Sequence, residues 1–429
     1  MKYLAKISRE SLACLSSLFS GKYRFLFISY LLVNFALFLY SFTQVDLSLV
    51  FSRSAVLREV IKSFQYIGYF DRPLSSFIYV SLVLALFTYY VIFLRLVRQK
   101  KITTKQLWGL LICIVPFFVM AYNGFSYDLF NYIFDAKILT FYHQNPYAHM
   151  ALDYPKDPML TFMHWTHRTY PYGPVWLAMT APLSFVALQY FIPTFYLFKL
   201  LMALSFMGTV YYIGKISDLW DTEKKVMNMV FFAFNPLVLI ESLISAHNDI
   251  VMMFMSVIAL YVLLKKKYLR SLFYLLLSIG IKFATFLVSP VFLLLGILIW
   301  RRKRYSYGVF VLLAISTMCL GVVLASFRTT FQPWYLLYIL PFAALRSQKF
   351  YISIPGVVLP LFALLMYLPF IYTGNWNPPI PSILNALAEW GIFVSVGGIL
   401  LYAGFQFVDK KAIFFPWARR YLLIWQHKK

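Results

Sequence analysis

Long apolar stretches without charged residues recur along this sequence, and they constrain its fold more than any other feature. Several reach the roughly 20 residues that a helix needs to cross the hydrocarbon core of a bilayer. Hydrophobic residues make up 62% of the chain and charged residues only 13%, whereas about a quarter of the residues in a soluble domain are charged. The sequence therefore predicts an all-α polytopic integral membrane protein.

The apolar stretches are numerous enough for about twelve transmembrane helices. The largest polar interruption is residues 124–173, and we expect no separate soluble domain. The predicted spans are residues 25–44, 75–94, 106–123, 194–214, 226–243, 250–264, 271–284, 286–300, 307–326, 334–346, 351–372 and 386–406.

Basic residues cluster between the apolar stretches instead of covering one soluble face. The formal net charge of +24 therefore does not indicate a nucleic-acid partner; it follows the positive-inside rule and suits contact with anionic membrane lipids. We expect a multi-pass protein of the cell membrane with both termini cytoplasmic, no cleavable signal peptide, and residues 124–173 extracytoplasmic. The basic connections expected in the cytoplasm are the N-terminus, 95–105, 265–270, 301–304 and 410–420.

One apolar segment, residues 174–190, is expected not to cross the membrane. A full crossing would place the lysines of residues 265–267 outside, against the positive-inside rule. The segment contains Pro174 and Pro182, and we expect it only to dip into the outer leaflet. The basic loop 53–72 falls outside in this topology and fits it poorly.

The chain has only fifteen acidic residues, so each can be considered in turn. Acids close to hydrocarbon are costly, and by default they mark a functional group or a paired structural charge. Those expected near the outer face are Asp128, Asp135, Asp153, Asp157, Glu241, Asp249 and Glu389.

Asp128 follows directly on a predicted span. Ser126 can cap a new helix with Asp128 in its first turn, and a carboxylate there suits a general base for an acceptor hydroxyl. Helix capping or a salt bridge is the alternative. Asp135 lies seven residues later and would share the same helix face; there it would contact substrate or pair with Lys137 or Arg168.

The same loop carries aromatic and histidine residues. Tyr147 follows Asn-Pro, and Tyr172 precedes Gly-Pro, so both occupy rigid corners whose aromatic faces suit a sugar ring or lipid. His164 and His167 are three residues apart and could share a helix face as ligands of a divalent metal. The spacing is a weak signal, and we predict neither a metal site nor a cofactor.

His247, Asn248 and Asp249 interrupt apolar sequence between two predicted spans. Polar groups at this depth indicate either a substrate site or structural contacts between helices. Both readings remain open on the residues alone.

Lys282 is the only charged residue between 271 and 300. A buried ammonium there needs an anion, and a lipid phosphate is the natural one; an acidic partner on another helix would argue against that role. Arg328, with Trp334 and Tyr335 shortly after it, ends a later span on the same predicted side.

These residues together resemble the GT-C superfamily of polyprenyl-phosphate-sugar-dependent glycosyltransferases, and most closely bacterial polyprenol-phosphate-mannose-dependent mannosyltransferases. The matching patches span residues 128–335, about half of the chain. They are Asp128 with Asn145-Pro146-Tyr147, Tyr172-Gly173-Pro174, His247-Asn248-Asp249 and Gln332-Pro333-Trp334-Tyr335.

The resemblance implies one GT-C-like transmembrane domain over residues 1–429, with an extracytoplasmic loop of juxtamembrane helices. Within it, residues 1–105 form an N-terminal helical hairpin, 106–346 the catalytic core with loop 124–173, and 347–429 the C-terminal helices and cytoplasmic tail. The implied reaction is inverting transfer of a sugar, mannose by likeness, from a polyprenyl-phosphate donor to a lipid or glycan acceptor at the extracytoplasmic face.

The resemblance makes Asp128 the catalytic base. We expect the acceptor and the sugar to contact Asp135, Tyr147, Tyr172, His247, Asn248, Asp249, Trp334 and Tyr335. We expect the donor phosphate to contact Lys282, Arg328 and Arg168.

The chief rival reading is a lipid or solute transporter or flippase of a cell-envelope glycan pathway. A long outer loop and polar residues gathered at one face disfavour it, as does the lack of a detectable inverted repeat. A structural membrane protein is the third reading.

Overall fold

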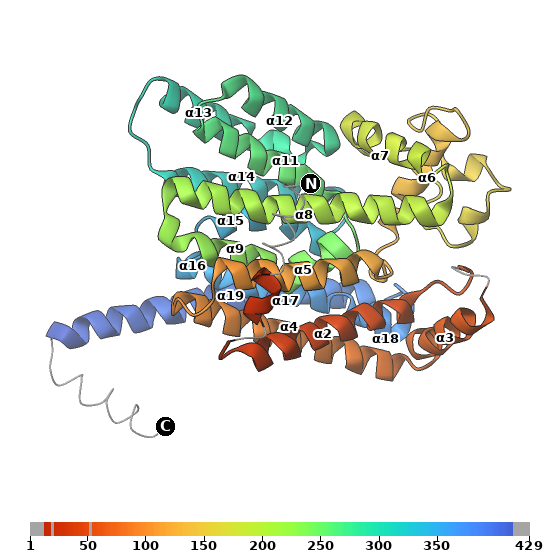
Figure 1. Cartoon of the computed structure of the whole chain (residues 1–429), viewed down its shortest axis with the longest axis horizontal. Helices are drawn as coiled ribbons and strands as arrows, with labels where there is room; N and C mark the ends of the chain where they lie inside the picture. The colour runs from red at the N-terminus through yellow and green to blue at the C-terminus, as the bar shows by residue number, and fades with distance from the viewer. Residues whose placement is uncertain (1–12, 19–20, 51–53, 415–429) are drawn as a thin grey trace.

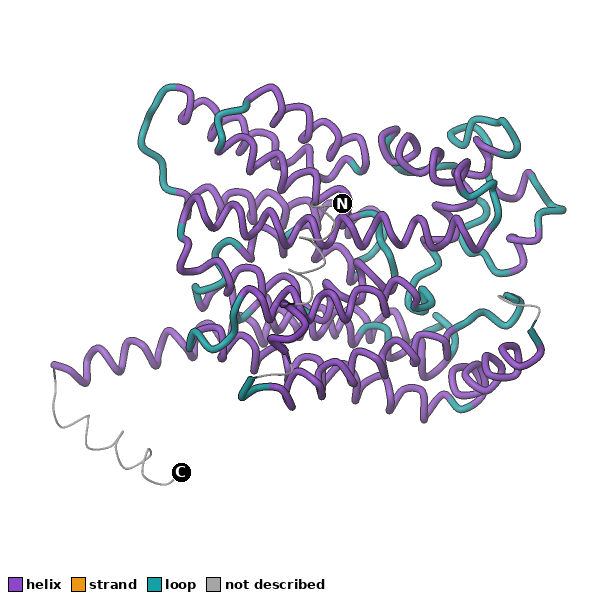
Figure 2. Tube along the Cα trace, viewed as in Figure 1, coloured by secondary structure: helices purple, strands orange, loops and turns teal. Residues whose placement is uncertain are grey.

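The computed structural model describes residues 13–18, 21–50 and 54–414, and these residues form an all-helical bundle. Figure 2 shows helices and loops and no strand in this part of the chain; one isolated bridge joins Met150 and Thr169. The all-α prediction is confirmed. The terminal residues 1–12 and 415–429, whose cytoplasmic side we predicted, lie outside the described residues.

Seven helices of the described chain are long and apolar enough to cross a bilayer, as a polytopic membrane protein requires. Two of them are runs of short helices: Phe283–Trp300, from η7 (Phe283–Val288) and α13 (Ser289–Trp300), and Phe350–Thr373, from α16 (Phe350–Ser353), α17 (Pro355–Leu365) and α18 (Leu368–Thr373). The others are α2 (Arg24–Ser41) with η1 (Phe42–Gln44), α4 (Arg72–Arg98), α8 (Phe191–Trp220), α14 (Tyr307–Arg328) and α19 (Ile380–Phe414).

The predicted count of about twelve spans is not confirmed, because several predicted spans form shorter helices. The segments predicted as 106–123, 250–264 and 271–284 are α5 (Thr104–Met120), α11 (Asp249–Leu264) and α12 (Tyr268–Ile281), each shorter than 18 residues. The segment predicted as 334–346 is a 3-10 helix, η8 (Pro333–Tyr338), followed by α15 (Leu340–Ala344). Hydropathy does not separate a short buried helix from a span, since both exclude charge.

A broken helix passes through the centre of the bundle. η5 (Thr222–Lys224) and α9 (Lys225–Ala233) precede the break, and α10 (Pro236–Leu239) and η6 (Ile240–Ile244) follow it at a bend of 58°. If this pair is one span, the count is eight. The break falls at Asn235-Pro236: proline lacks the N–H that would continue the helix, and the Asn235 side chain accepts a hydrogen bond from the N–H of Leu237.

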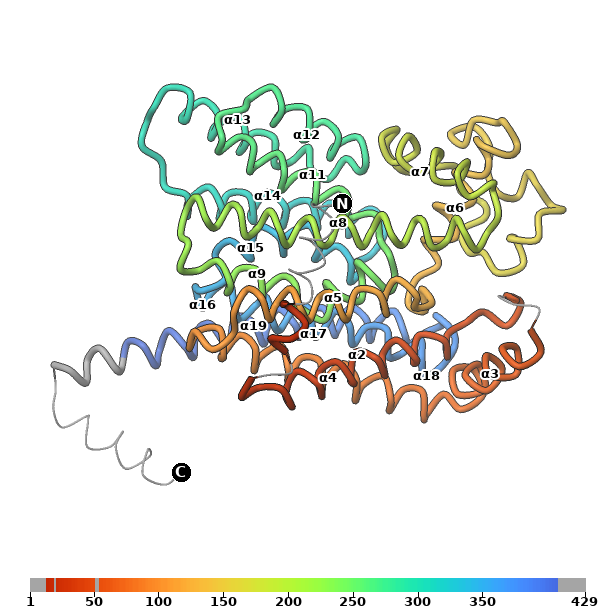
Figure 3. Tube along the Cα trace, viewed as in Figure 1, coloured from red at the N-terminus to blue at the C-terminus, as the bar shows by residue number. Residues whose placement is uncertain are grey.

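The segment around this break is the core of the molecule. Every residue from Met227 to Met253 is buried, and η6 packs against α5 and α8; Figure 3 shows the chain between α8 and α11 running through the middle of the bundle. Irregular backbone at membrane depth is tolerated only where protein or a water-filled cavity surrounds it. The acids and the histidine of this segment are therefore held inside the protein.

Two short helices lie at one end of the bundle, at the right in Figure 1. They are α6 (Asp128–Thr140) and α7 (Pro174–Val186), joined by a long loop with the 3-10 turns η3 (Ala151–Asp153) and η4 (Pro158–Thr161). The helix α3 (Ala55–Gln65) and the π-helix η2 (Tyr66–Phe70) lie at the same end. With 13 residues, α7 is too short to cross a bilayer, as expected for segment 174–190.

Candidate active site

Asp128 is the first residue of α6, at the end of the bundle where α6 and α7 lie. The chain leaves α5 at Ala121 with an extended backbone, and the Ser126 hydroxyl accepts a hydrogen bond from the N–H of Asp128 at 3.2 Å. The side-chain amide of Asn123 donates to the Ser126 carbonyl at 2.7 Å, which fixes this turn. The carboxylate therefore lies in the first turn of α6, as predicted.

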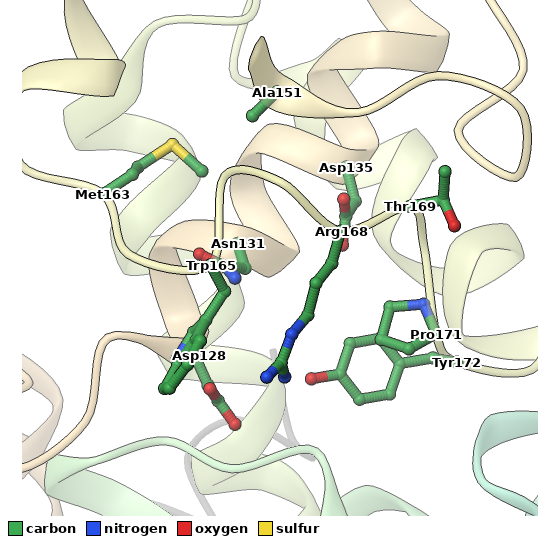
Figure 4. A pocket seen from close by; sticks show the side chains of 10 residues that line it. All are labelled: Asp128, Asn131, Asp135, Ala151, Met163, Trp165, Arg168, Thr169, Pro171 and Tyr172. Atoms are coloured by element: carbon green, nitrogen blue, oxygen red, sulfur yellow. The ribbon is translucent and has the colours of Figure 1, made fainter.

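A pocket with about 420 Å³ of empty space, part of it open to solvent, opens beside this carboxylate. Figure 4 shows the Arg168 guanidinium pointing between the Asp128 carboxylate and the Tyr172 hydroxyl. Arg168 also lies over the Trp165 ring, 4.3 Å from its centroid. The lining residues are Asp128, Asn131, Asp135, Ala151, Met163, Trp165, Arg168, Thr169, Pro171 and Tyr172.

The two pocket carboxyls have different environments. Burial and then the charge of Asp128 raise the pKa of Asp135 well above its ordinary value. Burial also acts to raise the pKa of Asp128, but His247, Lys282 and Arg168 together hold it below its ordinary value. The pKa values of the two pocket carboxyls are thus shifted in opposite directions, which favours the ionised form of Asp128 and the protonated form of Asp135.

Asp135 does not pair with Lys137, one of the partners considered for it. The Lys137 ammonium instead forms an ion pair with Asp157, whose carboxylate also accepts from the Tyr142 hydroxyl at 2.6 Å. Asp135 shares the pocket with Arg168 and Asp128, so the predicted common face of Asp128 and Asp135 is observed.

His247 lies directly behind Asp128 and is fully buried. Its Nδ1 is 3.5 Å from Oδ2 of Asp128, and its Nε2 is 3.3 Å from Oε2 of Glu241. The imidazole stacks on the Trp334 ring with centroids 4.1 Å apart, and the Tyr367 hydroxyl donates to the other oxygen of Glu241 at 2.9 Å. Burial lowers the pKa of His247, but the contacts with Asp128 and Glu241 outweigh it and raise that pKa to about 9.

Asn248 and Asp249 lie in the same buried layer. The Tyr132 hydroxyl donates to Oδ1 of Asn248 at 3.4 Å. Asp249 is fully buried and forms an ion pair with Lys282 at 2.7 Å, while the Lys282 side chain is 23% exposed. This acidic partner is the outcome that we expected to argue against a phosphate role for Lys282. We therefore withdraw that role.

The remaining predicted residues take different places. Tyr172 lines the pocket, whereas the Tyr147 hydroxyl donates to the Tyr172 carbonyl at 3.1 Å and thus supports the loop from behind. Tyr335 is buried under Lys282, with its hydroxyl 2.9 Å from that of Thr329. Arg328 is exposed at the end of α14 and is not among the pocket-lining residues.

Sequence reasoning missed several residues of this site. Asn131 and Trp165 line the pocket, and Tyr367 contacts Glu241. Lys199 is a buried charge in α8 that the rule applied to Lys282, a lone charge in an apolar run, would have found.

The described residues contain no group of three or more His, Cys, Asp or Glu side chains that could hold a metal ion. Of the two histidines considered as ligands, His164 stacks against Tyr127 with ring centroids 3.9 Å apart.

The fold is that of an all-α polytopic membrane protein with a polar pocket at one end of its helical bundle. The model of the MptA_B family, alpha-(1->6)-mannopyranosyltransferase, N-terminal domain, matches residues 35–302, and the chain belongs to this family. It is a glycosyltransferase of the mannosyltransferase kind, which confirms the resemblance seen in the sequence. The matched range includes Asp128, His247 and Lys282 but not Trp334. No curated protein and no solved structure matches the chain.

Proposed function

We propose that the protein transfers a mannosyl residue from a polyprenyl-phosphate donor to a lipid or glycan acceptor, with Asp128 as the general base. The observation that carries the proposal is the pocket itself, in which Asp128, Asp135 and Arg168 lie together and the pKa values of the two carboxyls are shifted in opposite directions. Transfer to a hydroxyl needs a proton acceptor beside the attacking oxygen and a cation beside the leaving phosphate.

In the proposed reaction, the acceptor oxygen forms a bond to the anomeric carbon as the bond from that carbon to the phosphate oxygen breaks. The acceptor proton passes to Asp128, and the polyprenyl phosphate leaves with the bonding electrons. One displacement inverts the configuration at the anomeric carbon. Phosphate leaves readily, so no covalent sugar–enzyme intermediate is required.

Arg168 is the cation that best suits the donor phosphate. It is the only lysine or arginine that lines the pocket, and its planar guanidinium can hold two phosphate oxygens at once. The raised pKa of Asp135 favours its protonated form, which can donate a hydrogen bond to a sugar hydroxyl or to the phosphate. Lys282 acts on Asp128 through its charge, and a phosphate contact for Arg328 stays a prediction.

The location of the basic loops supports an extracytoplasmic site. The connection between α13 and α14, which contains the basic residues 301–304, lies at the opposite end of the bundle from α6 and α7 (Figure 1). Basic connections face the cytoplasm by the positive-inside rule. The pocket would then open at the outer face, where a sugar on a lipid carrier is the available donor.

The test is a transfer assay on membranes that contain the protein, with radiolabelled polyprenyl-phosphate mannose and candidate glycolipid acceptors. Asp128→Asn keeps size and helix-start geometry but removes the proton acceptor, so we expect transfer to fall by about 100-fold or more. Asp153→Asn is the matched control, because Asp153 lies in the connection that follows α6 but outside the pocket lining. Near-normal transfer by Asp128→Asn would refute the assignment of Asp128 as the general base.

A further inference from the structure

A buried lysine lies at the base of both loops that carry the site. Lys199 is the only charged residue from Phe191 to Gly214 in α8, and its side chain is 1% exposed. It lies about 12 Å along the helix from the start of α8, from the rise per residue. An ammonium at this depth is costly unless its charge and its donors are satisfied.

The Lys199 ammonium is satisfied by backbone oxygens. Its Nζ donates to the carbonyl of Ala121 at 2.6 Å and to the carbonyl of Ile244 at 3.2 Å. The Phe195 ring lies 5.6 Å from the same nitrogen. Within the described residues no carboxylate forms an ion pair with Lys199, and the two acceptors at its Nζ are backbone carbonyls.

Both carbonyls belong to the C-terminal ends of helices. Ala121 is the residue directly after α5, and Ile244 is the last residue of η6. A helix C-terminus carries partial negative charge and carbonyls that lack a donor within the helix. A cation placed between two such ends stabilises both of them.

The same two carbonyls begin the two loops of the site. The chain after Ala121 leads to Asp128, and the chain after Ile244 leads to His247 and Asn248. The loops meet again at their far side, through the Asp128–His247 contact and the hydrogen bond from Tyr132 to Asn248. Lys199 is thus the contact that joins them at the base.

We propose that Lys199 is a positioning residue, which fixes the Asp128 loop and the His247 loop relative to each other by holding both carbonyls. It is not among the pocket-lining residues, so it acts on the reaction through the loops. An apolar side chain of similar length would leave both carbonyls without this donor and let the loops separate. The consequence for transfer rests on the proposed function, whereas the joining of the loops does not.

Hydrogen–deuterium exchange of the purified protein tests the joining of the loops directly. In Lys199→Met we expect backbone amides of both 121–127 and 244–248 to exchange several-fold faster. The control is Lys215→Met on the same helix, whose ammonium lies over the Tyr211 ring and should leave both segments unchanged. Unchanged exchange in either segment of Lys199→Met overturns the inference. If Lys199→Met does not accumulate, Lys199→Leu, which also lacks a hydrogen-bond donor, carries the same test.

Steady-state transfer kinetics test the consequence for catalysis. Misplacement of a catalytic group by about 1 Å can cost on the order of 100-fold in rate, so Lys199→Met should lower kcat by about 10- to 100-fold with the donor KM nearly unchanged. Lys199→Arg should recover most of the rate, because a guanidinium can also donate to two carbonyls. A loss of transfer that is proportional to the loss of folded protein contradicts a positioning role. Absence of transfer in the wild type refutes the proposed function and leaves the exchange result standing.

Discussion

The site has two layers that hold similar residues in different states. The pocket wall, formed by Asp128, Asp135, Arg168 and Tyr172, comes from α6 and the loop before α7, and it is open to a ligand. The buried layer is formed by Glu241 of η6, by His247 and Asn248 of the loop after η6, and by Asp249 at the start of α11. All four residues are fully buried. Acids occur in both layers, but only those of the wall face empty space.

The two layers differ in how their charges are paired. In the buried layer, Glu241 and Asp249 have a cationic partner each, His247 and Lys282, so the layer is close to neutral overall. In the pocket wall, the charge of Asp128 is balanced only by the imidazole of His247 and by the nearby charges of Lys282 and Arg168. A proton gained by Asp128 as a phosphate leaves would therefore change the charge of the wall and not that of the layer beneath.

The two cations should respond to substitution in opposite ways. Lys282→Met leaves Asp249 buried without its partner, and breaking a buried pair costs about 3–5 kcal/mol of unfolding free energy. Arg168→Met removes an exposed cation from the wall, so it should raise the donor KM by about tenfold or more with stability unchanged. Thermal unfolding and donor-saturation kinetics on both variants check this.

The double variant Lys282→Met with Asp249→Asn gives the matched control for that comparison. It removes both charges together, and most of the lost stability should return because no buried charge is left alone. A donor KM that rises in Lys282→Met at normal stability would instead restore the phosphate role that we withdrew.

The buried layer should also make stability depend on pH. The pKa of His247 is raised from 6.5 to about 9 in the folded protein, so the folded state binds a proton that the unfolded state releases at lower pH. This stabilisation is fully present below about pH 6.5 and is lost as pH rises through about 9; its size is up to about 3 kcal/mol. Thermal unfolding of wild type should weaken across this window, and His247→Gln should weaken much less. Equal slopes in both proteins would mean that His247 is not the titrating group.

Much of the wall could be predicted from sequence because its determinants are local. The turn Ser126–Asp128 sets the start of α6, and the seven-residue spacing sets the common face of Asp128 and Asp135. The number of spans could not be predicted in the same way. The break at Asn235-Pro236 and the short helices α11 and α12 have the same apolar composition as true spans, and their lengths depend on tertiary packing.

The buried layer could not be predicted, because its contacts join residues far apart in the chain. Hydropathy places His247 and Asp128 near one face, but nothing local indicates that the imidazole bridges Asp128 and Glu241. Likewise the lone charge Lys282 indicated an anion, which we predicted to be a lipid phosphate, and Asp249 takes that place. A single sequence gives the kind of partner that a buried charge needs, while the fold gives its identity.

The substitution with the smallest expected effect, Asp135→Asn, distinguishes the two carboxyls of the pocket wall most clearly. The pKa of Asp135 is raised well above its ordinary value by burial and by the charge of Asp128, so its carboxyl keeps its proton to a higher pH than an ordinary carboxyl does. Asp135→Asn replaces it with a neutral group of similar size that still donates and accepts hydrogen bonds. We expect transfer to fall by less than about tenfold, equivalent to less than about 1.4 kcal/mol in the barrier, whereas Asp128→Asn should cost about 100-fold or more. The variant should also be at least as stable as wild type above pH 7, because the raised pKa of Asp135 in the folded state lowers the stability of the wild type at that pH and the amide of Asn does not ionise.

Both variants can be compared in one transfer assay at equal amounts of folded protein. A large loss in Asp135→Asn together with near-normal transfer by Asp128→Asn would exchange the roles of the two residues.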